Sequence, residues 1–242
     1  MIVFNCRDPK NGKKFSPDGE GALEINGKEL AELAAFKGNI AICIHGYNND
    51  HSDVVSAMKE TFSHLDGMDD ILPIVFSWPS NGNIFSYLSD KRDTDRAALL
   101  LANFIKTTFQ DDQIVSLEGH SMGNLVIAKC IEKHLKPGDI KVWIALGADL
   151  ARNRFRPKNR WGKIASKIDM LVVFYSKWDR VLRYPSVLFN FMFRLGCRGL
   201  PEKRPDNYIQ TDANAVSEGK KVRHTSYKKI RMLARYAFSF IR

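Results

Sequence analysis

Cysteine is scarce in this chain, and long hydrophobic stretches are missing. Its 242 residues include four cysteines, which are scattered without the paired spacing of a zinc site or the density of a disulfide framework. Cys6, Cys43 and Cys130 lie in apolar patterns, where cysteine usually serves as a small core residue. No apolar run is long enough to span a membrane, and the first residues lack the layout of a signal peptide. We therefore expect a cytoplasmic protein with reduced thiols.

The sequence also lacks motifs that mark several other classes of protein. Neither Gly-x-x-x-x-Gly-Lys nor Gly-x-Gly-x-x-Gly occurs, which disfavours nucleotide-dependent chemistry. It contains no zinc finger and no RNA-binding aromatic motif, so no specific nucleic-acid partner is predicted.

Acidic residues are few in the second half of the chain. Residues 1–149 contain 15 lysines and arginines against 21 acidic residues, whereas residues 150–242 contain 22 against 6, and the net charge is +10. The densest basic group includes no acidic residue and comprises Arg152, Arg154, Arg156, Lys158, Arg160, Lys163 and Lys167. Such a positive field attracts anionic lipid headgroups, phosphorylated substrates or nucleic acid. The alternative is a solvated basic face without a partner.

Apolar residues make up 44% of the chain, which suits one α/β domain over residues 1–242 with a sizeable core. Short apolar runs predict strands at Ile2–Cys6, Glu20–Ile25, Asn39–His45, Ile71–Trp78, Ile114–Leu117, Val142–Leu146, Met170–Tyr175 and Tyr208–Thr211. Helical patterns occur at Lys28–Phe36, Asp53–Leu65, Asp93–Phe109, from Asn124 to about Leu135, and at Thr225–Ile241. This alternation predicts a mainly parallel sheet with helices on both sides.

The sequence Gly-His-Ser-Met-Gly at residues 119–123 lies between a predicted strand and a predicted helix. A strand that turns sharply into a helix exposes the central serine, and the flanking positions must be small because side chains there would collide with neighbouring elements. The same turn directs backbone N–H groups toward a reacting carbonyl. The pattern therefore predicts that Ser121 is a nucleophile; the alternative is a glycine-rich turn with an idle serine.

A serine nucleophile needs a base, and the base needs a group that orients it. In the order serine, acid, histidine, two histidines follow Ser121. His134 falls near the end of the predicted elbow helix, so His224, after the last predicted strand, is the predicted base. Asp179 and Asp149 each follow a predicted strand, and we favour Asp179 as the acid and keep Asp149 as the alternative acid or as an organiser of the loops.

An oxyanion hole needs two backbone N–H donors. One is predicted at Met122, the residue after the nucleophile. The second is expected in the loop after the strand at Asn39–His45, where Gly46 allows close approach of a substrate and Tyr47 or Asn48 supplies the N–H group.

These segments together resemble the α/β-hydrolase superfamily. More closely, the chain is similar to an uncharacterised esterase/lipase-like bacterial family known as a domain of unknown function. The matching segments are His45-Gly46-Tyr47-Asn48, Ser77-Trp78-Pro79-Ser80, Tyr87 with Asp90, Gly119-His120-Ser121-Met122-Gly123-Asn124, Ala148-Asp149, and His224 before an aromatic residue. The resemblance implies an eight-strand-like sheet, in which the first strands can be altered, and a serine hydrolase site. It implies no particular substrate.

An apolar excursion at residues 180–204 directly follows Asp179. Its apolar side chains are Val181, Leu182, Tyr184, Val187, Leu188, Phe189, Phe191, Met192, Phe193 and Leu195. We expect either a hydrophobic cap that binds an acyl chain or touches a membrane, or a helix packed against the sheet. Ile84, Phe85 and Tyr87 offer a second wall, with core packing as the alternative.

The leading hypothesis is an esterase/lipase-like serine hydrolase that cleaves a carboxylic ester through an acyl-enzyme and requires neither a metal nor an organic cofactor. An apolar cap beside a basic surface suits an anionic lipid, such as a phospholipid or lysophospholipid ester, and peripheral contact with an anionic membrane. The alternatives are an acyltransferase on the same residues, and a catalytically silent hydrolase fold that binds an anionic surface or a partner protein.

Overall fold

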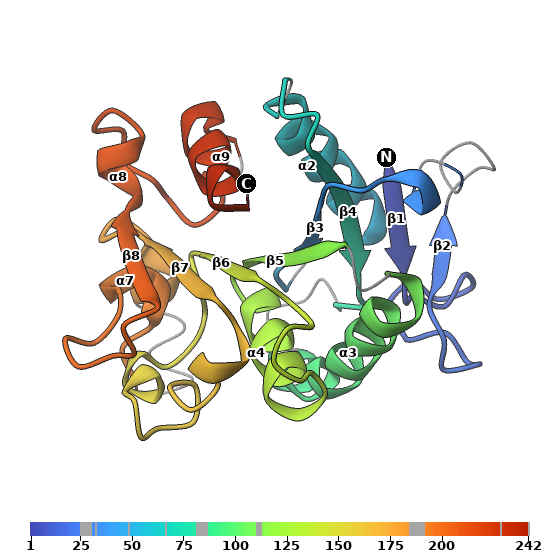
Figure 1. The fold of residues 1–242 in the computed structure, drawn as a ribbon, viewed down its shortest axis with the longest axis horizontal. Helices are drawn as coiled ribbons and strands as arrows, with labels where there is room; N and C mark the ends of the chain where they lie inside the picture. The colour runs from blue at the N-terminus through green and yellow to red at the C-terminus, as the bar shows by residue number, and fades with distance from the viewer. Residues whose placement is uncertain are drawn as a thin grey trace.

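A computed structural model describes residues 1–24, 31, 33–47, 49–65, 67–80, 87–109, 113–183, 192–227 and 229–241. Eight strands form one sheet in the order β2-β1-β4-β3-β5-β6-β7-β8 (Figure 1). Their bounds are β1 Ile2–Asn5, β2 Ala22–Glu24, β3 Asn39–Ile44, β4 Ile71–Ser77, β5 Ile114–His120, β6 Val142–Leu146, β7 Met170–Tyr175 and β8 Tyr208–Asp212.

Every pair of neighbouring strands is parallel except β1 and β2. β1 lies beside β4, with Ile2 opposite Ile74, and β2 forms an antiparallel outer edge, with Val3 opposite Glu24. The predicted mainly parallel α/β architecture is therefore confirmed. Because the strands are parallel, the carboxyl ends of β3, β5, β6 and β7 lie at one edge of the sheet, where the predicted site residues follow them.

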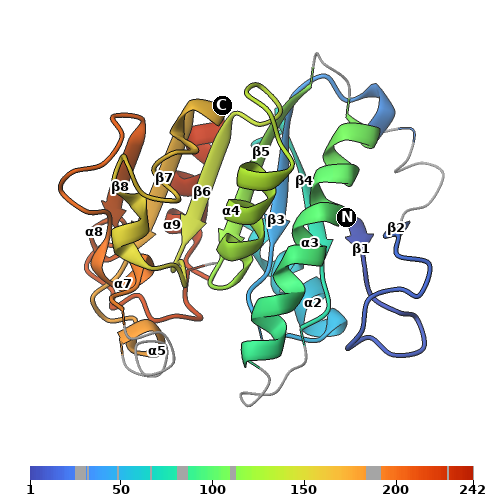
Figure 2. The same cartoon turned by 90° about the horizontal axis from the view of Figure 1, so that it is seen from below.

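Helices α3 and α4 cover one face of the sheet, and α2 and α9 cover the other (Figure 2). The helices are α2 His51–Ser63, α3 Tyr87–Thr108, α4 Gly123–Lys133, α5 Arg180–Arg183, α7 Leu195–Arg198, α8 Ala213–Val216 and α9 Arg231–Phe238, with 3₁₀ turns at Arg152–Phe155, Ala165–Lys167 and Ser239–Ile241.

The two faces of the sheet build two hydrophobic cores. Successive side chains of a strand point to opposite faces, so Ile40, Ile42 and Ile44 of β3 join the core beneath α3 and α4. Ala41 and Cys43, between them, join the core beneath α2 and α9. All five are fully buried, which explains why this strand is almost continuously apolar in sequence.

Two predicted helices begin six residues away from the predicted position. α3 begins at Tyr87 rather than at Asp93. The last helix begins at Arg231 rather than at Thr225, because residues 224–227 form a turn in which Ser226 N–H donates to the Arg223 carbonyl, and Lys229 N–H donates to the Ser226 carbonyl. Of the helix predicted at Lys28–Phe36, residues 28–30 and 32 lie outside the described residues, and residues 31 and 33–35 are helical.

All four cysteines are buried and unbridged. In the part of the chain that the structure describes, no helix combines the length and apolar character needed to cross a membrane.

Candidate active site

Ser121 occupies a strained turn between β5 and α4. Its φ is +52°, in the left-handed region that most residues avoid. A Cβ at Gly119 would lie 2.6 Å from Asn124 Oδ1, and one at Gly123 would lie 2.5 Å from the carbonyl oxygens of Ile44 and His45. The two glycines are therefore required by close packing on either side of the serine, as the sequence pattern predicts.

The side chain of Asn124 stabilises this turn through hydrogen bonds, a role that sequence reasoning did not predict. Its amide donates to the carbonyls of Gly119, at 2.9 Å, and Ser121, at 3.2 Å, and its Oδ1 accepts from Trp143 Nε1 at 3.0 Å. All of these partners are buried, so the strained turn is held by satisfied hydrogen bonds.

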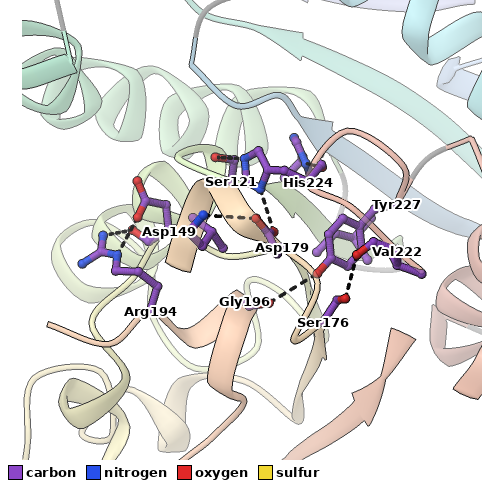
Figure 3. Close-up of polar contacts among 12 residues, drawn as sticks. Ser121, Asp149, Ser176, Asp179, Arg194, Gly196, Val222, His224 and Tyr227 are labelled. Carbon is purple, nitrogen blue, oxygen red and sulfur yellow. Dashed lines mark hydrogen bonds and ion pairs between the residues drawn. The ribbon is translucent and has the colours of Figure 1, made fainter. Parts of the chain in front are cut away.

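The structure brings Ser121, His224 and Asp179 into one hydrogen-bonded chain (Figure 3). His224 Nε2 lies 2.9 Å from Ser121 Oγ, and His224 Nδ1 lies 2.7 Å from Asp179 Oδ2. Because the carboxylate accepts, Nδ1 carries the proton, which leaves Nε2 free to accept from the serine hydroxyl. This arrangement can raise the nucleophilicity of the serine.

Asp179 follows β7 and is completely buried. Its Oδ1 accepts from the backbone N–H of Leu182, 3.1 Å away in α5, so both carboxylate oxygens have partners. Gly147, with φ of +48°, lies against it: a Cβ there would be 3.3 Å from Asp179 Oδ2 and 2.8 Å from the ring of Tyr227. The pair of hydrogen bonds fixes the carboxylate toward the imidazole.

Three side chains that sequence reasoning did not select hold the loop that carries His224. Ser176 Oγ donates to the Val222 carbonyl at 2.6 Å, and Asn214 Oδ1 accepts from Val222 N–H at 2.9 Å. His120 Nε2 lies 2.7 Å from the His224 carbonyl, which can only accept, so His120 donates. His120 is the residue before the nucleophile, and its position was the only sequence signal of this role.

Asp149, the alternative acid, has different partners. Its Oδ2 accepts from Tyr87 Oη at 2.7 Å, and its Oδ1 accepts from Arg194 Nε at 2.5 Å. Arg194 Nη2 also donates to the Asp149 backbone carbonyl. Both ring nitrogens of His224 are already occupied, so Asp149 organises the surrounding loops in this arrangement, which was the second role considered for it.

The loop after β3 lies directly against the nucleophile. A Cβ at Gly46 would be 2.9 Å from Ser121 Cβ, and Met122, at the start of α4, is almost fully buried. Tyr47 is partly exposed with its ring edge-on to Tyr87, and burial raises the pKa of Tyr47. Asn48 lies outside the described residues.

Buried polar side chains support this loop. His45 Nδ1 lies 2.6 Å from the Gly46 carbonyl, and its Nε2 accepts from Trp78 N–H at 3.1 Å. Arg7 donates to the Asn49 carbonyl at 3.0 Å, and burial lowers the pKa of Arg7 to about 10. Sequence reasoning did not select Arg7, whose partner lies 42 residues away.

The apolar excursion is only partly within the described residues. Residues 184–191, like Ile84 and Phe85 of the proposed second wall, lie outside them. Leu182 and Leu195 are buried, whereas Met192 and Phe193 are 40% and 63% exposed. The excursion thus contributes both core side chains and exposed apolar surface.

A mainly parallel eight-stranded sheet with a serine at a strand-to-helix elbow defines an α/β hydrolase. Residues 26–233 match the model of the family described as alpha/beta hydrolase of unknown function (DUF900), and the chain belongs to this family. An uncharacterised protein of Nostoc sp. is 30% identical over 100 residues, which cover 39% of this chain and 24% of that protein. The chain thus matches about a quarter of this relative's length.

Solved esterase structures are similar to this chain at low sequence identity. An esterase of Pyrococcus furiosus, Pf2001, superposes with a TM-score of 0.50 and 11% identity over 85% of this chain and 84% of its own. Esterase PE8 gives a TM-score of 0.49 and 14% identity over 86% of this chain and 94% of its own. The likeness to the Pyrococcus furiosus esterase, at 11% identity, shows the shared architecture alone.

Proposed function

We propose that this protein is a serine hydrolase of carboxylic esters, with Ser121 as nucleophile, His224 as general base and Asp179 as the residue that orients the base. The hydrogen-bonded chain from Ser121 Oγ through His224 to the buried carboxylate of Asp179 carries this proposal. The strained backbone at Ser121 supports it, because such strain persists where a functional geometry requires it.

In the proposed reaction, Ser121 Oγ attacks the ester carbonyl while His224 Nε2 takes the hydroxyl proton. The resulting oxyanion accepts hydrogen bonds from the backbone N–H of Met122 and from that of Tyr47 or Asn48. The carbon–oxygen bond to the alcohol then breaks, and the alcohol leaves with the proton from His224. Water, deprotonated by His224, attacks the acyl-enzyme and releases the acid and the free serine.

Fluorophosphonate labelling tests the nucleophile. We expect the wild-type protein to be labelled at one serine, the Ser121→Ala variant to remain unlabelled, and a Ser226→Ala control, two residues from His224, to label like wild type. With a panel of p-nitrophenyl esters of increasing acyl-chain length, the wild-type protein and the Ser226→Ala control should hydrolyse at least one ester, and the Ser121→Ala variant should hydrolyse none. Folded wild-type protein that neither labels nor hydrolyses any ester would support the catalytically silent alternative instead.

An acyltransferase would use the same acyl-enzyme with another acceptor. Product analysis in the presence of competing alcohols and thiols distinguishes the two, because a hydrolase yields the free acid whatever acceptor is present. If acyl transfer is faster than hydrolysis at low acceptor concentration, the protein is an acyltransferase and the hydrolase proposal is wrong.

A further inference from the structure

A hollow of about 650 Å³ lies beside α4, and half of the residues that line it are basic; we call it the basic hollow. Its charged residues are Arg154, Lys158, Arg160, Lys163, Lys167 and Glu132. Five cations thus share one concave surface with one carboxylate, a concentration of like charge that repels itself and attracts anions.

Two of these cations are already used by the fold. Arg160 donates to both carboxylate oxygens of Glu132, at 2.8 and 2.7 Å, which neutralises the one acid in the hollow. Lys167 Nζ donates to the carbonyls of Ile131 and Leu135, at 2.9 and 2.8 Å, where α4 ends. Arg152, outside the hollow, likewise donates to the Gly199 and Leu200 carbonyls.

The remaining cations are Arg154, Lys158 and Lys163. Their side chains are exposed and form no hydrogen bond or ion pair with any residue in the described ranges. The basic run therefore contains three side chains that stabilise the fold, three that face the hollow without a partner among the described residues, and Arg156, which is exposed and does not line the hollow.

These three cations are carried by an ordered segment. The Arg154 carbonyl accepts from the backbone N–H groups of Trp161 and Gly162, at 2.8 and 3.1 Å. Phe155 and Trp161 are buried, and Tyr208 Oη donates to the Trp161 carbonyl at 2.7 Å. A fixed backbone lowers the entropy lost when the side chains bind a ligand.

A second hollow, of about 270 Å³, adjoins the basic hollow on the side of the elbow. It shares Arg154, Arg160 and Met192 with the basic hollow and extends to Leu125 and Asp149. Leu125 is one helical turn after Ser121, and Asp149 N–H donates to the Ser121 carbonyl at 3.2 Å. The two hollows thus share part of their lining, and the second one reaches residues that neighbour the nucleophile.

We propose that the basic hollow binds a phosphate group of the substrate while its ester carbonyl lies at Ser121, so that the substrates are phosphate-bearing carboxylic esters. This inference rests on the proposed function, which supplies the ester that is cleaved. The three unused cations support the presence of a phosphate in the substrate. Arginine contributes a bidentate fork to phosphate oxygens and the two lysines contribute point charges. The phosphate belongs either to a soluble ester or to a lipid headgroup.

Binding of sn-glycerol 3-phosphate, measured by isothermal titration calorimetry against glycerol, tests the subsite. The test variant is R154A/K158A/K163A, and the matched control is R156A/K136A/K203A, which loses the same charge from exposed positions that do not line the hollow. We expect the test variant to bind at least ~10-fold more weakly than wild type and the control to bind like wild type. Thermal unfolding of each protein verifies the fold.

Comparison of the soluble probe with phosphatidylglycerol vesicles separates the two sources of phosphate. Vesicles of phosphatidylcholine, whose headgroup has no net charge, serve as the control. Binding of the soluble probe that is lost in the test variant supports a subsite for soluble esters, and binding of phosphatidylglycerol vesicles alone, lost in the same variant, supports a headgroup subsite. Equal weakening in both triple variants, or no binding of either probe by wild type, overturns the proposal. Because glycerol 3-phosphate has no carboxylic ester, its binding is independent of Ser121 labelling, so the two proposals fail separately.

Discussion

Two buried aspartates at the ends of neighbouring strands have separate tasks. Asp179 divides its oxygens between His224 and a backbone N–H, whereas Asp149 pairs with Arg194 and Tyr87. The first arrangement orients an imidazole, and the second compensates a buried guanidinium whose charge would otherwise be isolated. Substitution of each carboxylate by its amide should therefore affect different properties.

Asp179→Asn should lower kcat for a p-nitrophenyl ester by roughly 10³–10⁴-fold, because the amide no longer holds His224 in the productive tautomer. Asp149→Asn should instead lower the free energy of unfolding by about 3–5 kcal/mol, because it leaves Arg194 buried without its partner charge. Steady-state kinetics and urea unfolding of both variants measure the two effects. A larger loss of kcat in Asp149→Asn than in Asp179→Asn would reverse the assignment of the acid.

Chain order and strand ends were sufficient to select Ser121, His224 and Asp179, which the structure brings together; their catalytic roles stay predictions. The residues that fix them were not predictable in the same way. Ser176 and Asn214 act on Val222 across 46 and 8 residues of sequence, and no local pattern marks such pairs. Hydrogen bonds of this kind depend on how distant segments meet, which only the folded chain defines.

At the scale of elements, α2 begins immediately after the loop that carries Gly46. Asp50 caps this helix: its Oδ1 accepts from Asp53 N–H at 2.8 Å and from Ser52 Oγ at 2.7 Å. The backbone hydrogen bond from Asp53 lowers the pKa of the Asp50 carboxyl. A charged cap at this position therefore stabilises both the helix and the end of the neighbouring loop.

This cap predicts a pH-dependent contribution to stability. A carboxyl whose pKa is lower in the folded state stabilises the fold above its unfolded pKa and loses that contribution as the pH falls through its folded pKa. Asp50→Asn should therefore melt below wild type at neutral pH, and the difference in Tm should shrink as the pH falls below about 4. Calorimetry of both proteins from neutral to acidic pH measures this difference in Tm. A difference that stays constant over this range would show that the carboxylate charge does not contribute to stability.

Elements buried on both faces were predicted closely, whereas helix starts were not. Val142–Leu146 and Met170–Tyr175 were predicted with their observed bounds, because turn residues interrupt the apolar pattern at both ends. Thr225 resembled a helix start, but Tyr227 is fully buried with its hydroxyl 3.3 Å from the Gly196 carbonyl. The packing of this ring outweighs the local helical propensity, so the helix begins only at Arg231.

At the scale of the whole molecule, positive charge is concentrated in residues 150–242, which contribute two of the strands, β7 and β8, and every basic side chain of the basic hollow. The sequence revealed this imbalance, but it could not separate Lys167, which binds helix carbonyls, from Lys163, which has no such partner in the described residues. Composition defines the field around a protein, and the fold decides which charges remain available to a ligand.

Salt should therefore affect phosphate-bearing and neutral esters differently. Raising NaCl from about 20 to about 500 mM shortens the screening length several-fold, so kcat/KM for the anionic ester should fall while that for a matched neutral ester changes little. The salt dependence should be weaker in R154A/K158A/K163A than in R156A/K136A/K203A. If kcat/KM of the wild-type protein depends on salt concentration equally for both esters, this surface has no electrostatic role in substrate binding.

The hydrogen bond between Ser121 and His224 joins positions 103 residues apart in the chain. Since the ribosome releases a protein from its N-terminus, the elbow serine emerges well before the imidazole that would activate it. A nascent chain that has reached only β6 or β7 thus presents an ordinary, unreactive hydroxyl. The proposed chemistry consequently begins only after the chain has been synthesised past His224 and the segment beyond β8 has docked, so that ester cleavage is tied to completion of this fold.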